Sequence, residues 1–358
     1  MTKITIIIPT YNRPHCLKRI LNYYYSFIEL PKEAKMKDDF EFIVADSSSP
    51  ENKIKNKEII SRFCDLNIRH IKNYPEEMNP WHKFADAVKY AKNEYCLFCS
   101  DDDFVFPKSV VFCADFLRNN SSFAAAHGHY IMFRLEEKGG GKAFWLSDNS
   151  LESITNSRAE IRLKEHLSNY ILPTFSALHR TKLLQMALEE TTKFTNDNRF
   201  GELLPSMLVP IYGKIKCFDL PYAVQEMNVG SVGTTTETLE DFIKEGSYEE
   251  KYRKFRGCLS TNLSLNSKLS REESEKIIDL AMADYLGKNY PKSLKSSFFK
   301  KMKAILPQKI YKTIKSIYIK NRFSKLKDNF SVLAESPSFE YREEFEKIKN
   351  CIMSCGKI

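Results

Sequence analysis

Residues 4–14 of this 358-residue chain read ITIIIPTYNRP, and this stretch decides the first unit of the fold. The apolar run Ile4–Ile8 predicts a β-strand that ends at Pro9. The polar residues that follow form a loop, and Pro14 begins a helix at the position where a missing backbone N–H costs nothing. The stretch therefore predicts a strand, a loop and a helix in succession.

The same alternation of apolar runs and amphipathic segments continues along the chain. A second strand, residues 40–45, ends in Asp46, and a short third strand covers residues 68–71. A helix over residues 80–92 leads to the apolar run Tyr95–Ser100. The pattern predicts an α/β fold, a Rossmann-like doubly wound and mostly parallel sheet. Polar residues follow three of its strands, at the sheet edge where such folds bind ligands.

The most distinctive polar group is the acid turn, which we define as Asp101, Asp102 and Asp103. Three adjacent carboxylates at the end of a buried strand repel one another. Solvent screening, a bound proton or a metal ion would relieve that repulsion. If the acid turn is a functional site, a metal ion is the expected partner of its carboxylates. The alternative is an ordinary surface turn, whose charges are screened by solvent.

Composition excludes several classes of protein. The net charge of +9 is modest, and the basic and acidic residues are mixed, so we expect no nucleic-acid partner. The nine cysteines are odd in number and scattered, which indicates a reducing cytosol rather than a disulfide framework. Cys96 and Cys99 have the spacing of zinc ligands, but they lie within an apolar strand and we expect them to be core residues. No apolar run reaches the length of about 20 residues that a membrane span needs. We expect a cytoplasmic protein.

Three segments together carry a resemblance to a known family. They are residues 6–13 (IIIPTYNR), residues 44–48 (VADSS) and residues 99–104 (CSDDDF) followed by Pro107. In this order and at these intervals, they resemble family 2 glycosyltransferases of the GT-A fold. The resemblance implies a nucleotide-diphosphate-sugar donor, a divalent metal (Mn²⁺ or Mg²⁺) and inversion at the anomeric carbon. It covers a domain of residues 1–236, with a nucleotide-sugar half (1–118) and an acceptor half (119–236).

The resemblance also implies roles for residues of the nucleotide-sugar half. Pro9, Thr10, Tyr11 and Arg13 match the nucleotide-binding loop. Asp46 matches the acid that meets the base or the ribose, although an Asp before Ser-Ser-Ser-Pro also suits an Asx turn. Lys83 is placed to face the diphosphate, although a lone lysine is often merely solvated.

The acid turn departs from the family pattern. Alignment through Pro107 puts Ser100 where the family often has its first acid. We expect Asp103 to bind the metal, since hard ions need only one or two protein carboxylates beside phosphate oxygens. Asp101 and Asp102 are then expected to contact the ribose or the donor sugar.

On the acceptor side, counting back from Gly213 puts Glu202 where the family has its catalytic Asp, with Asp197 as the alternative. One carboxylate base is enough for inversion. Glu202 also suits the first turn of a helix, where the helix dipole favours an acid. The family's late histidine has no counterpart in residues 221–228.

From about residue 237 the sequence becomes charged and helical, and we treat residues 237–358 as a helical, basic C-terminal region. Residues 292–327 mix lysines with bulky apolar residues. They suit either contact with an anionic membrane surface or a helical hairpin packed on the domain.

The sequence thus predicts a metal-dependent inverting glycosyltransferase. It would use a glycan or lipid-linked acceptor in the assembly of a surface polysaccharide or glycolipid. Two alternatives stay open: a non-catalytic scaffold on a degenerate transferase fold, and a sugar-nucleotide pyrophosphorylase.

Overall fold

The structure is a computed structural model that describes residues 3–28, 38–135, 143–149, 152–170, 174–226, 246–289 and 340–354. The strands are β1 Ile4–Thr10, β2 Phe40–Asp46, β3 Ile68–Ile71, β4 Tyr95–Phe98, β5 Phe104–Val105, β6 Phe123–Leu135, β7 Ala143–Asn149, β8 Leu178–Arg180 and β9 Lys214–Glu226. The helices are α1 Pro14–Ile28, α2 Pro50–Ile60, α3 Pro80–Ala87, α4 Pro107–Asn119, α5 Ala159–Ser168, α6 Thr181–Phe194, α7 Asn198–Tyr212, α9 Tyr248–Leu265, α10 Arg271–Asn289 and α14 Arg342–Ser354, with short 3₁₀ turns at Val88–Tyr90 and Thr174–Ser176.

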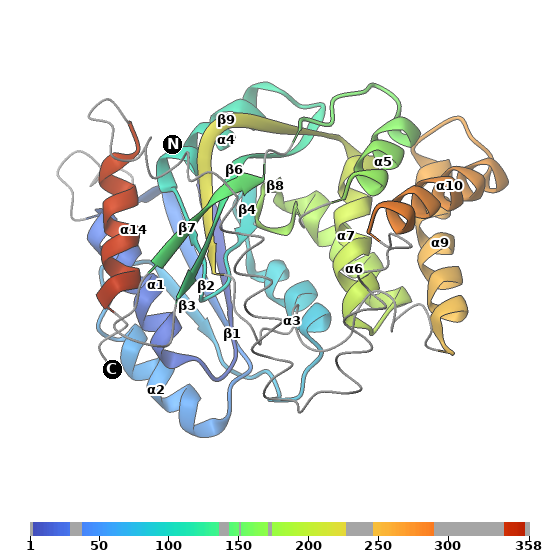
Figure 1. Ribbon diagram of the computed structural model, residues 1–358. Helices are drawn as coiled ribbons and strands as arrows, with labels where there is room; N and C mark the ends of the chain where they lie inside the picture. Colours follow the sequence, from blue (N-terminus) through green and yellow to red (C-terminus); the bar gives the residue numbers. More distant parts are fainter. Residues whose placement is uncertain are drawn as a thin grey trace, which may run out of the picture.

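Within these residues the strands form one sheet in the order β3-β2-β1-β4-β8-β6-β9-β5, and β7 pairs with β6 (Figure 1). β1 lies between β2 and β4, and the first four strands are parallel. The register sets Thr10 opposite Asp46. The carboxyl ends of β1, β2 and β4 therefore meet at one edge of the sheet, as the sequence predicts.

The second half of the sheet is mixed. β8 runs antiparallel to both β4 and β6, β5 runs antiparallel to β9, and β6 and β9 are parallel. The predicted α/β fold class is confirmed. The antiparallel strands come from the later part of the chain, where short strands lie next to helices and the sequence pattern gives no direction.

Alternate residues of the buried strands supply two different cores. Ile4, Ile6 and Ile8 pack with residues of α1, α4 and α14 on one face of the sheet. Ile7 packs on the other face with residues of α3 and α6. Cys96 and Cys99 are buried in these cores, as predicted, and all eight described cysteines are free.

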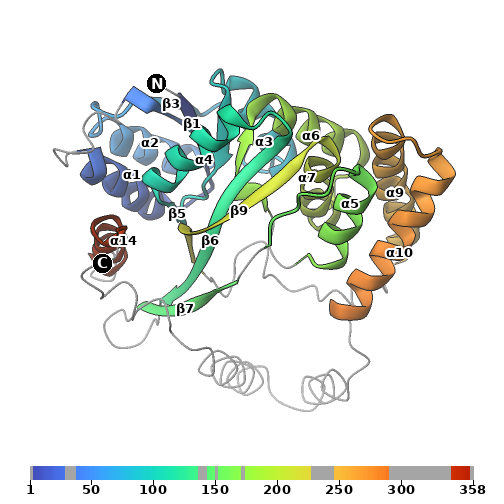
Figure 2. The same ribbon diagram turned by 90° about the horizontal axis from the view of Figure 1, so that it is seen from above.

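The described helices of the C-terminal region join different parts of the molecule. α9 and α10 pack with α5 and α7 in a third core, whereas α14 packs beside α1. Figures 1 and 2 show α14 at one end of the molecule and α9 and α10 at the other. The predicted membrane-binding segment, residues 292–327, lies outside the described residues. Among the described helices, none has the length and hydropathy of a membrane span.

Candidate active site

The acid turn begins three positions after the last residue of β4, and Arg13, from the loop between β1 and α1, contacts it. Nη2 of Arg13 lies 2.5 Å from Oδ1 of Asp101, and Nη1 lies 2.6 Å from Oδ2 of Asp102. One guanidinium thus contacts two adjacent carboxylates and offsets part of their negative charge. The sequence led us to consider solvent, a proton or a metal for this purpose, and the structure adds an arginine.

Asp101 is the most enclosed of the three acids. Its side chain is fully buried, and the Thr10 hydroxyl donates a 2.6 Å hydrogen bond to Oδ2. Burial raises the pKa of Asp101 to about 7, while Arg13 and Thr10 oppose that rise. Asp101 therefore ties the end of β1 to the end of β4.

Asp103 is the acid that is only partly buried. Its Oδ1 accepts the backbone N–H of Glu226 at 3.0 Å, and its Oδ2 lies 3.4 Å from Nε2 of Gln225. Burial and the neighbouring charge of Asp102 raise the pKa of Asp103. Both partners come from the end of β9, so the last strand of the sheet helps to shape the acid turn.

A second arginine, Arg19 of α1, also connects the acid turn to the end of β9. Nη2 of Arg19 donates to the backbone carbonyl of Asp102 at 2.8 Å and to Oε2 of Glu226 at 2.6 Å. Arg19 is buried, with only 4% of its surface exposed. A buried charge pair that also satisfies a backbone carbonyl holds its partners in one geometry.

Lys83, the residue predicted to face a diphosphate, lies at the same sheet edge. Its Nζ donates to Oγ of Ser47 at 2.9 Å and lies 3.3 Å from the carbonyl of Thr10. Burial lowers the pKa of Lys83 to about 8, and the charges of Asp101 and Asp46 oppose that change. The lysine is a buried residue of the site and not a solvated surface side chain.

Asp46 lies at the same edge of the sheet, but its carboxylate oxygens are occupied by hydrogen bonds within the protein. Its Oδ1 accepts the N–H of Ser48, which is the Asx turn considered from the sequence. Its Oδ2 accepts from Asn56 at 2.9 Å and lies 3.0 Å from Nε2 of His70. Burial by itself would raise the pKa of Asp46, but these hydrogen bonds outweigh it and lower the pKa to about 2. A base or ribose would have to displace one of these partners to reach the carboxylate.

The other loop residues divide into buried and exposed. Pro9 is part of β1 and pairs with Ala45, so β1 extends beyond Pro9 to Thr10. Tyr11 is 46% exposed. Between Tyr11 and Arg13, Asn12 adopts a left-handed backbone conformation with φ of 54°.

Glu202 lies in the first turns of α7, and its neighbours are Tyr170 and Arg199. The Tyr170 hydroxyl is 3.3 Å from Oε1 of Glu202. Burial raises the pKa of Glu202, and Tyr170 and Arg199 oppose the rise. A carboxylate with a raised pKa is better matched to proton abstraction near neutral pH.

Asp197, the alternative base, is the N-cap of α7. Its Oδ1 accepts the N–H of Phe200 at 2.8 Å, and its Oδ2 accepts the Thr195 hydroxyl at 2.6 Å. Both oxygens are therefore engaged in ending the α6–α7 loop and starting the helix.

α3 and α7 connect the two parts of the site. A Cβ added to Gly201 would lie 2.2 Å from Nε1 of Trp81, so the two helices touch at a glycine. Trp81 precedes Lys83 on α3 by two positions, and Gly201 precedes Glu202 directly. A shift of α7 against α3 would therefore move the candidate base relative to the candidate phosphate site.

The residues of the acid turn suit a divalent metal, although no group of three or more His, Cys, Asp or Glu side chains within the described ranges is arranged to hold one. Mg²⁺ and Mn²⁺ prefer carboxylate oxygens and complete their shell with substrate phosphates and water. Asp103 is a partly exposed residue, and its carboxylate lies near the charge of Asp102 and contacts the end of β9 through both oxygens. It fits a single-carboxylate ligand of this kind.

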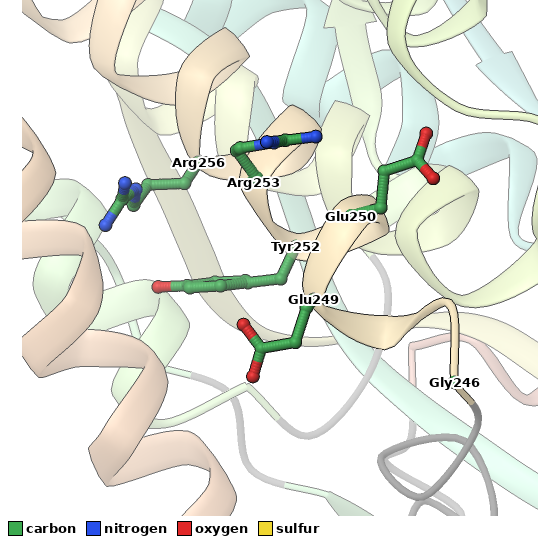
Figure 3. A pocket seen from close by; sticks show the side chains of 6 residues that line it. All are labelled: Gly246, Glu249, Glu250, Tyr252, Arg253 and Arg256. Atoms are coloured by element: carbon green, nitrogen blue, oxygen red, sulfur yellow. The ribbon is translucent and has the colours of Figure 1, made fainter.

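A cavity of about 450 Å³ lies elsewhere, at the start of α9 (Figure 3). Its lining residues are Gly246, Glu249, Glu250, Tyr252, Arg253 and Arg256. None of them is a residue that the sequence predicts for the site, and their charges are mixed. We assign no step of the chemistry to this cavity.

Three residues of the site escaped the sequence analysis: Asn12, Arg19 and Glu226. Arg19 and Glu226 are 207 positions apart in sequence, and no local pattern could have paired them. Asn12 did carry a signal, because asparagine is one of the few residues that tolerate the left-handed conformation. It stands in the middle of the predicted loop.

The comparison with known families decides which family the chain belongs to. The profile of glycosyl transferase family 2 matches residues 5–185, which include the loop between β1 and α1, Lys83 and the acid turn. The chain belongs to glycosyl transferase family 2. The family resemblance predicted from the sequence is thereby confirmed.

Solved structures of this family share the fold of the chain. TarS of S. aureus, residues 1–349 in complex with UDP-GlcNAc, superposes with a TM-score of 0.56 at 15% identity. The match covers 99% of this chain and 91% of that one. A longer TarS structure gives a TM-score of 0.53 at 17% identity and is covered over 55% of its length. These matches show a GT-A type fold.

A curated relative matches a shorter segment. It is the poly(ribitol-phosphate) beta-glucosyltransferase of Bacillus spizizenii, 27% identical over 122 residues. The match covers 34% of this chain and 18% of that protein. The aligned part is thus less than a fifth of the relative's length.

Proposed function

We propose that this protein is an inverting glycosyltransferase that moves a sugar from a UDP-sugar to an acceptor hydroxyl of a cell-surface polymer or of its lipid-linked precursor. The observation that supports this proposal best is the charge arrangement at the carboxyl ends of β1, β2 and β4. The buried Lys83 lies there next to the carbonyl of Thr10. Arg13 contacts the carboxylate of Asp101, which also accepts the Thr10 hydroxyl. Such a site suits a sugar nucleotide, whose diphosphate carries negative charge and whose ribose and donor sugar carry hydroxyl groups.

Support for the donor and the acceptor comes from the relatives. One TarS structure contains UDP-GlcNAc, and the Bacillus relative is named for a poly(ribitol phosphate) acceptor and a glucosyl group. We therefore propose a uridine diphosphate donor and a polyol-phosphate type of polymer as the first acceptor class to test. The acceptor would approach from the side of α7.

In the proposed reaction, the acceptor oxygen attacks the anomeric carbon from the face opposite the diphosphate. The new carbon–oxygen bond forms as the bond to the diphosphate breaks, and the leaving group takes the electron pair. Glu202 accepts the proton of the attacking hydroxyl, which a raised pKa favours. No covalent intermediate is needed, so the anomeric configuration inverts.

The chain's own cations handle the leaving group. Lys83 uses two acceptors within the protein and, as an ammonium, has a third N–H for a phosphate oxygen. Arg13 holds Asp101 and Asp102 in place, and Asp103 would hold a divalent metal. That metal, when bound, would neutralise charge that develops on the departing diphosphate.

Hydrolysis of UDP-sugars in the absence of acceptor tests the proposal. The wild type should release UDP slowly in the presence of Mn²⁺, and Asp103→Ala should abolish the release while the protein stays folded. A thermal-shift screen of UDP-, GDP- and CDP-sugars with Mn²⁺ identifies the donor, because a ligand that binds only the folded state raises its melting temperature. A protein that neither binds nor hydrolyses any of them would be the scaffold alternative. Release of pyrophosphate from a nucleoside triphosphate would favour the pyrophosphorylase.

A further inference from the structure

The backbone at Asn12 is unusual. Its φ of 54° makes it the one non-glycine residue with a positive φ in the described part of the chain. A Cβ makes this conformation unfavourable, and glycine is the residue that adopts it without strain. Asparagine tolerates it better than most residues but still needs local hydrogen bonds.

Asn12 makes those hydrogen bonds with a neighbouring loop. Its Oδ1 accepts the N–H of Ser49 at 2.8 Å and Nδ2 of Asn52 at 3.0 Å. Its backbone N–H donates to Oγ of Ser48 at 2.8 Å, and its Nδ2 donates to Oε1 of Glu76 at 3.0 Å. Glycine could make only the backbone bond, so the side chain of Asn12 supplies three anchors that the turn would otherwise lack.

The loop that Asn12 contacts is itself fixed. Asp46 accepts the N–H of Ser48, and Asn56 lies 3.4 Å from Oγ of Ser48. Asn12 is therefore anchored to a turn that the buried Asp46 holds in place. The buried Asp46 therefore supports the turn to which Asn12 is hydrogen-bonded.

The reversal at Asn12 places its two neighbours differently. Tyr11 on one side is 46% exposed, while Arg13 on the other side reaches back to Asp101 and Asp102. Pro14 then begins α1 directly. In a loop of three residues between β1 and α1, the conformation of the middle residue determines where both neighbours lie.

We propose that Asn12 is a positioning residue that preforms the nucleotide-binding loop before the donor arrives. The inference rests on the proposed function and adds a residue that acts through Tyr11 and Arg13 rather than on the donor. The hydrogen bonds of Asn12 are already formed in the absence of ligand, so the free energy of donor binding does not include a cost for ordering the loop. Without them, the donor would have to select the competent loop from several conformations.

The experiment uses the full chain and four variants. Asn12→Ala loses the side-chain anchors and favours a different φ, whereas Asn12→Gly loses the anchors but keeps the left-handed φ. Asn12→Asp, made together with Glu76→Gln so that the new carboxylate does not face another one, keeps an acceptor at Oδ1 and tolerates the same φ. Asn262→Ala is the matched control. Asn262 lies on the distant helix α9, and it also makes hydrogen bonds through both ends of its amide: Oδ1 accepts from the Tyr212 hydroxyl, and Nδ2 donates to the carbonyl of Cys258.

Binding of UDP is measured by calorimetry well below the melting temperature of every variant, and donor KM and kcat are measured for hydrolysis. We expect Asn12→Ala and Asn12→Gly to weaken UDP binding and raise the donor KM by about tenfold, the scale of one or two lost hydrogen bonds. The kcat at saturating donor should change less than twofold. Asn12→Asp with Glu76→Gln should recover most of the affinity, and Asn262→Ala should lower the melting temperature without an effect on KM.

Wild-type affinity in folded Asn12→Ala and Asn12→Gly would overturn the inference and leave the proposed function intact. A loss confined to kcat would also overturn it, since a preformed binding loop acts on KM. A wild type that does not bind UDP would instead refute the proposed function, and the inference would fall with it.

Discussion

The guanidinium of Arg13 lies 2.6 Å from the carboxylate of Asp102, and its other terminal nitrogen contacts Asp101. The acid turn of this glycosyltransferase is therefore neutralised in part by the loop between β1 and α1. A ligand that recruits either Arg13 or the acids changes the environment of the other. This relationship gives the first prediction.

Replacing Arg13 by Ala leaves two adjacent carboxylates without their cation. We expect the melting temperature to fall by roughly 5 °C, because carboxylates at this spacing repel each other in a partly buried site. Addition of Mn²⁺ should raise the melting temperature of the variant more than that of the wild type. Arg118→Ala is the control, since the Arg118–Asp115 pair is exposed on α4. Equal responses to Mn²⁺ in Arg13→Ala and wild type would mean that the arginine does not stand in for a metal.

Glu202→Gln should separate chemistry from donor binding. The amide cannot accept the acceptor proton, so we expect kcat for transfer to fall by about 10²–10⁴ while the affinity for UDP is unchanged. Asp197→Asn should leave kcat within a few fold, because asparagine is as good an N-cap as aspartate. The reverse pattern, with a severe loss only in Asp197→Asn, would move the catalytic base to Asp197.

Gly201→Ala tests the contact between α3 and α7. The added methyl would lie 2.2 Å from the indole of Trp81, so one helix must move. Overpacking of this kind costs about 1–3 kcal/mol of unfolding free energy, partly offset by the better helix propensity of alanine. We expect lower stability by chemical denaturation and a lower kcat, since Glu202 moves with the helix. Gly257→Ala on α9 is the control, because its added Cβ meets only the end of Arg271 at 3.7 Å. A fully active and stable Gly201→Ala would show that the helices can separate freely.

The depressed pKa of Lys83 predicts how donor binding depends on pH. Burial lowers this pKa to about 8, so the free enzyme carries the ammonium below that pH and loses it above. Affinity for UDP should therefore be constant below pH 7 and decline as the pH rises through 8. Lys83→Gln should bind weakly and without this decline, as measured by calorimetry from pH 6.5 to 9. A pH profile that is the same in the variant would assign the titration to another group.

Two buried histidines predict sensitivity of the fold to acid. His127 and His179 are each 1% exposed, and burial lowers the pKa of each to about 4. The unfolded chain binds a proton at each histidine below pH 6.5, and the folded chain does so only near pH 4. Stability is thus full above pH 6.5 and falls as the pH is lowered, by about 2 kcal/mol per histidine at pH 5.

Urea denaturation between pH 7.5 and 5 measures this decline. His179→Gln should reduce its slope, because glutamine can donate to the Thr174 carbonyl that accepts from the His179 ring. Stability that does not change between pH 7 and pH 5 would contradict the prediction.

The sequence predicted the elements that lie close together along the chain. The parallel strands, the helix that begins at Pro14 and the acid turn after β4 all follow from local patterns of apolar and polar residues. The family resemblance was confirmed for the same reason, because its motifs are short and ordered. The roles that it implied for individual residues stay predictions, and the predicted donor side was brought together at one sheet edge.

The contacts that the sequence could not predict join residues that are far apart along the chain. The cation beside Asp101 and Asp102 is 88 or more positions away, since it is Arg13. The hydrogen bonds that occupy Asp46 come from Asn56 and His70, on different elements. Local propensity carries no information on such pairs, because they form only when the sheet brings separate strand ends to one edge.

The sequence by itself determined the α/β fold class and the family, and it predicted part of the residues that lie at the candidate site, since each depends on patterns within a strand, a loop or a helix. Tertiary structure alone decided how those residues are used. It paired Arg13 with the acid turn, buried Asp46 as the support of Asn12, and bound Glu226 to Arg19 across the sheet. The physical reason is that charge neutralisation and burial depend on distances in space, which a linear chain does not specify until it folds.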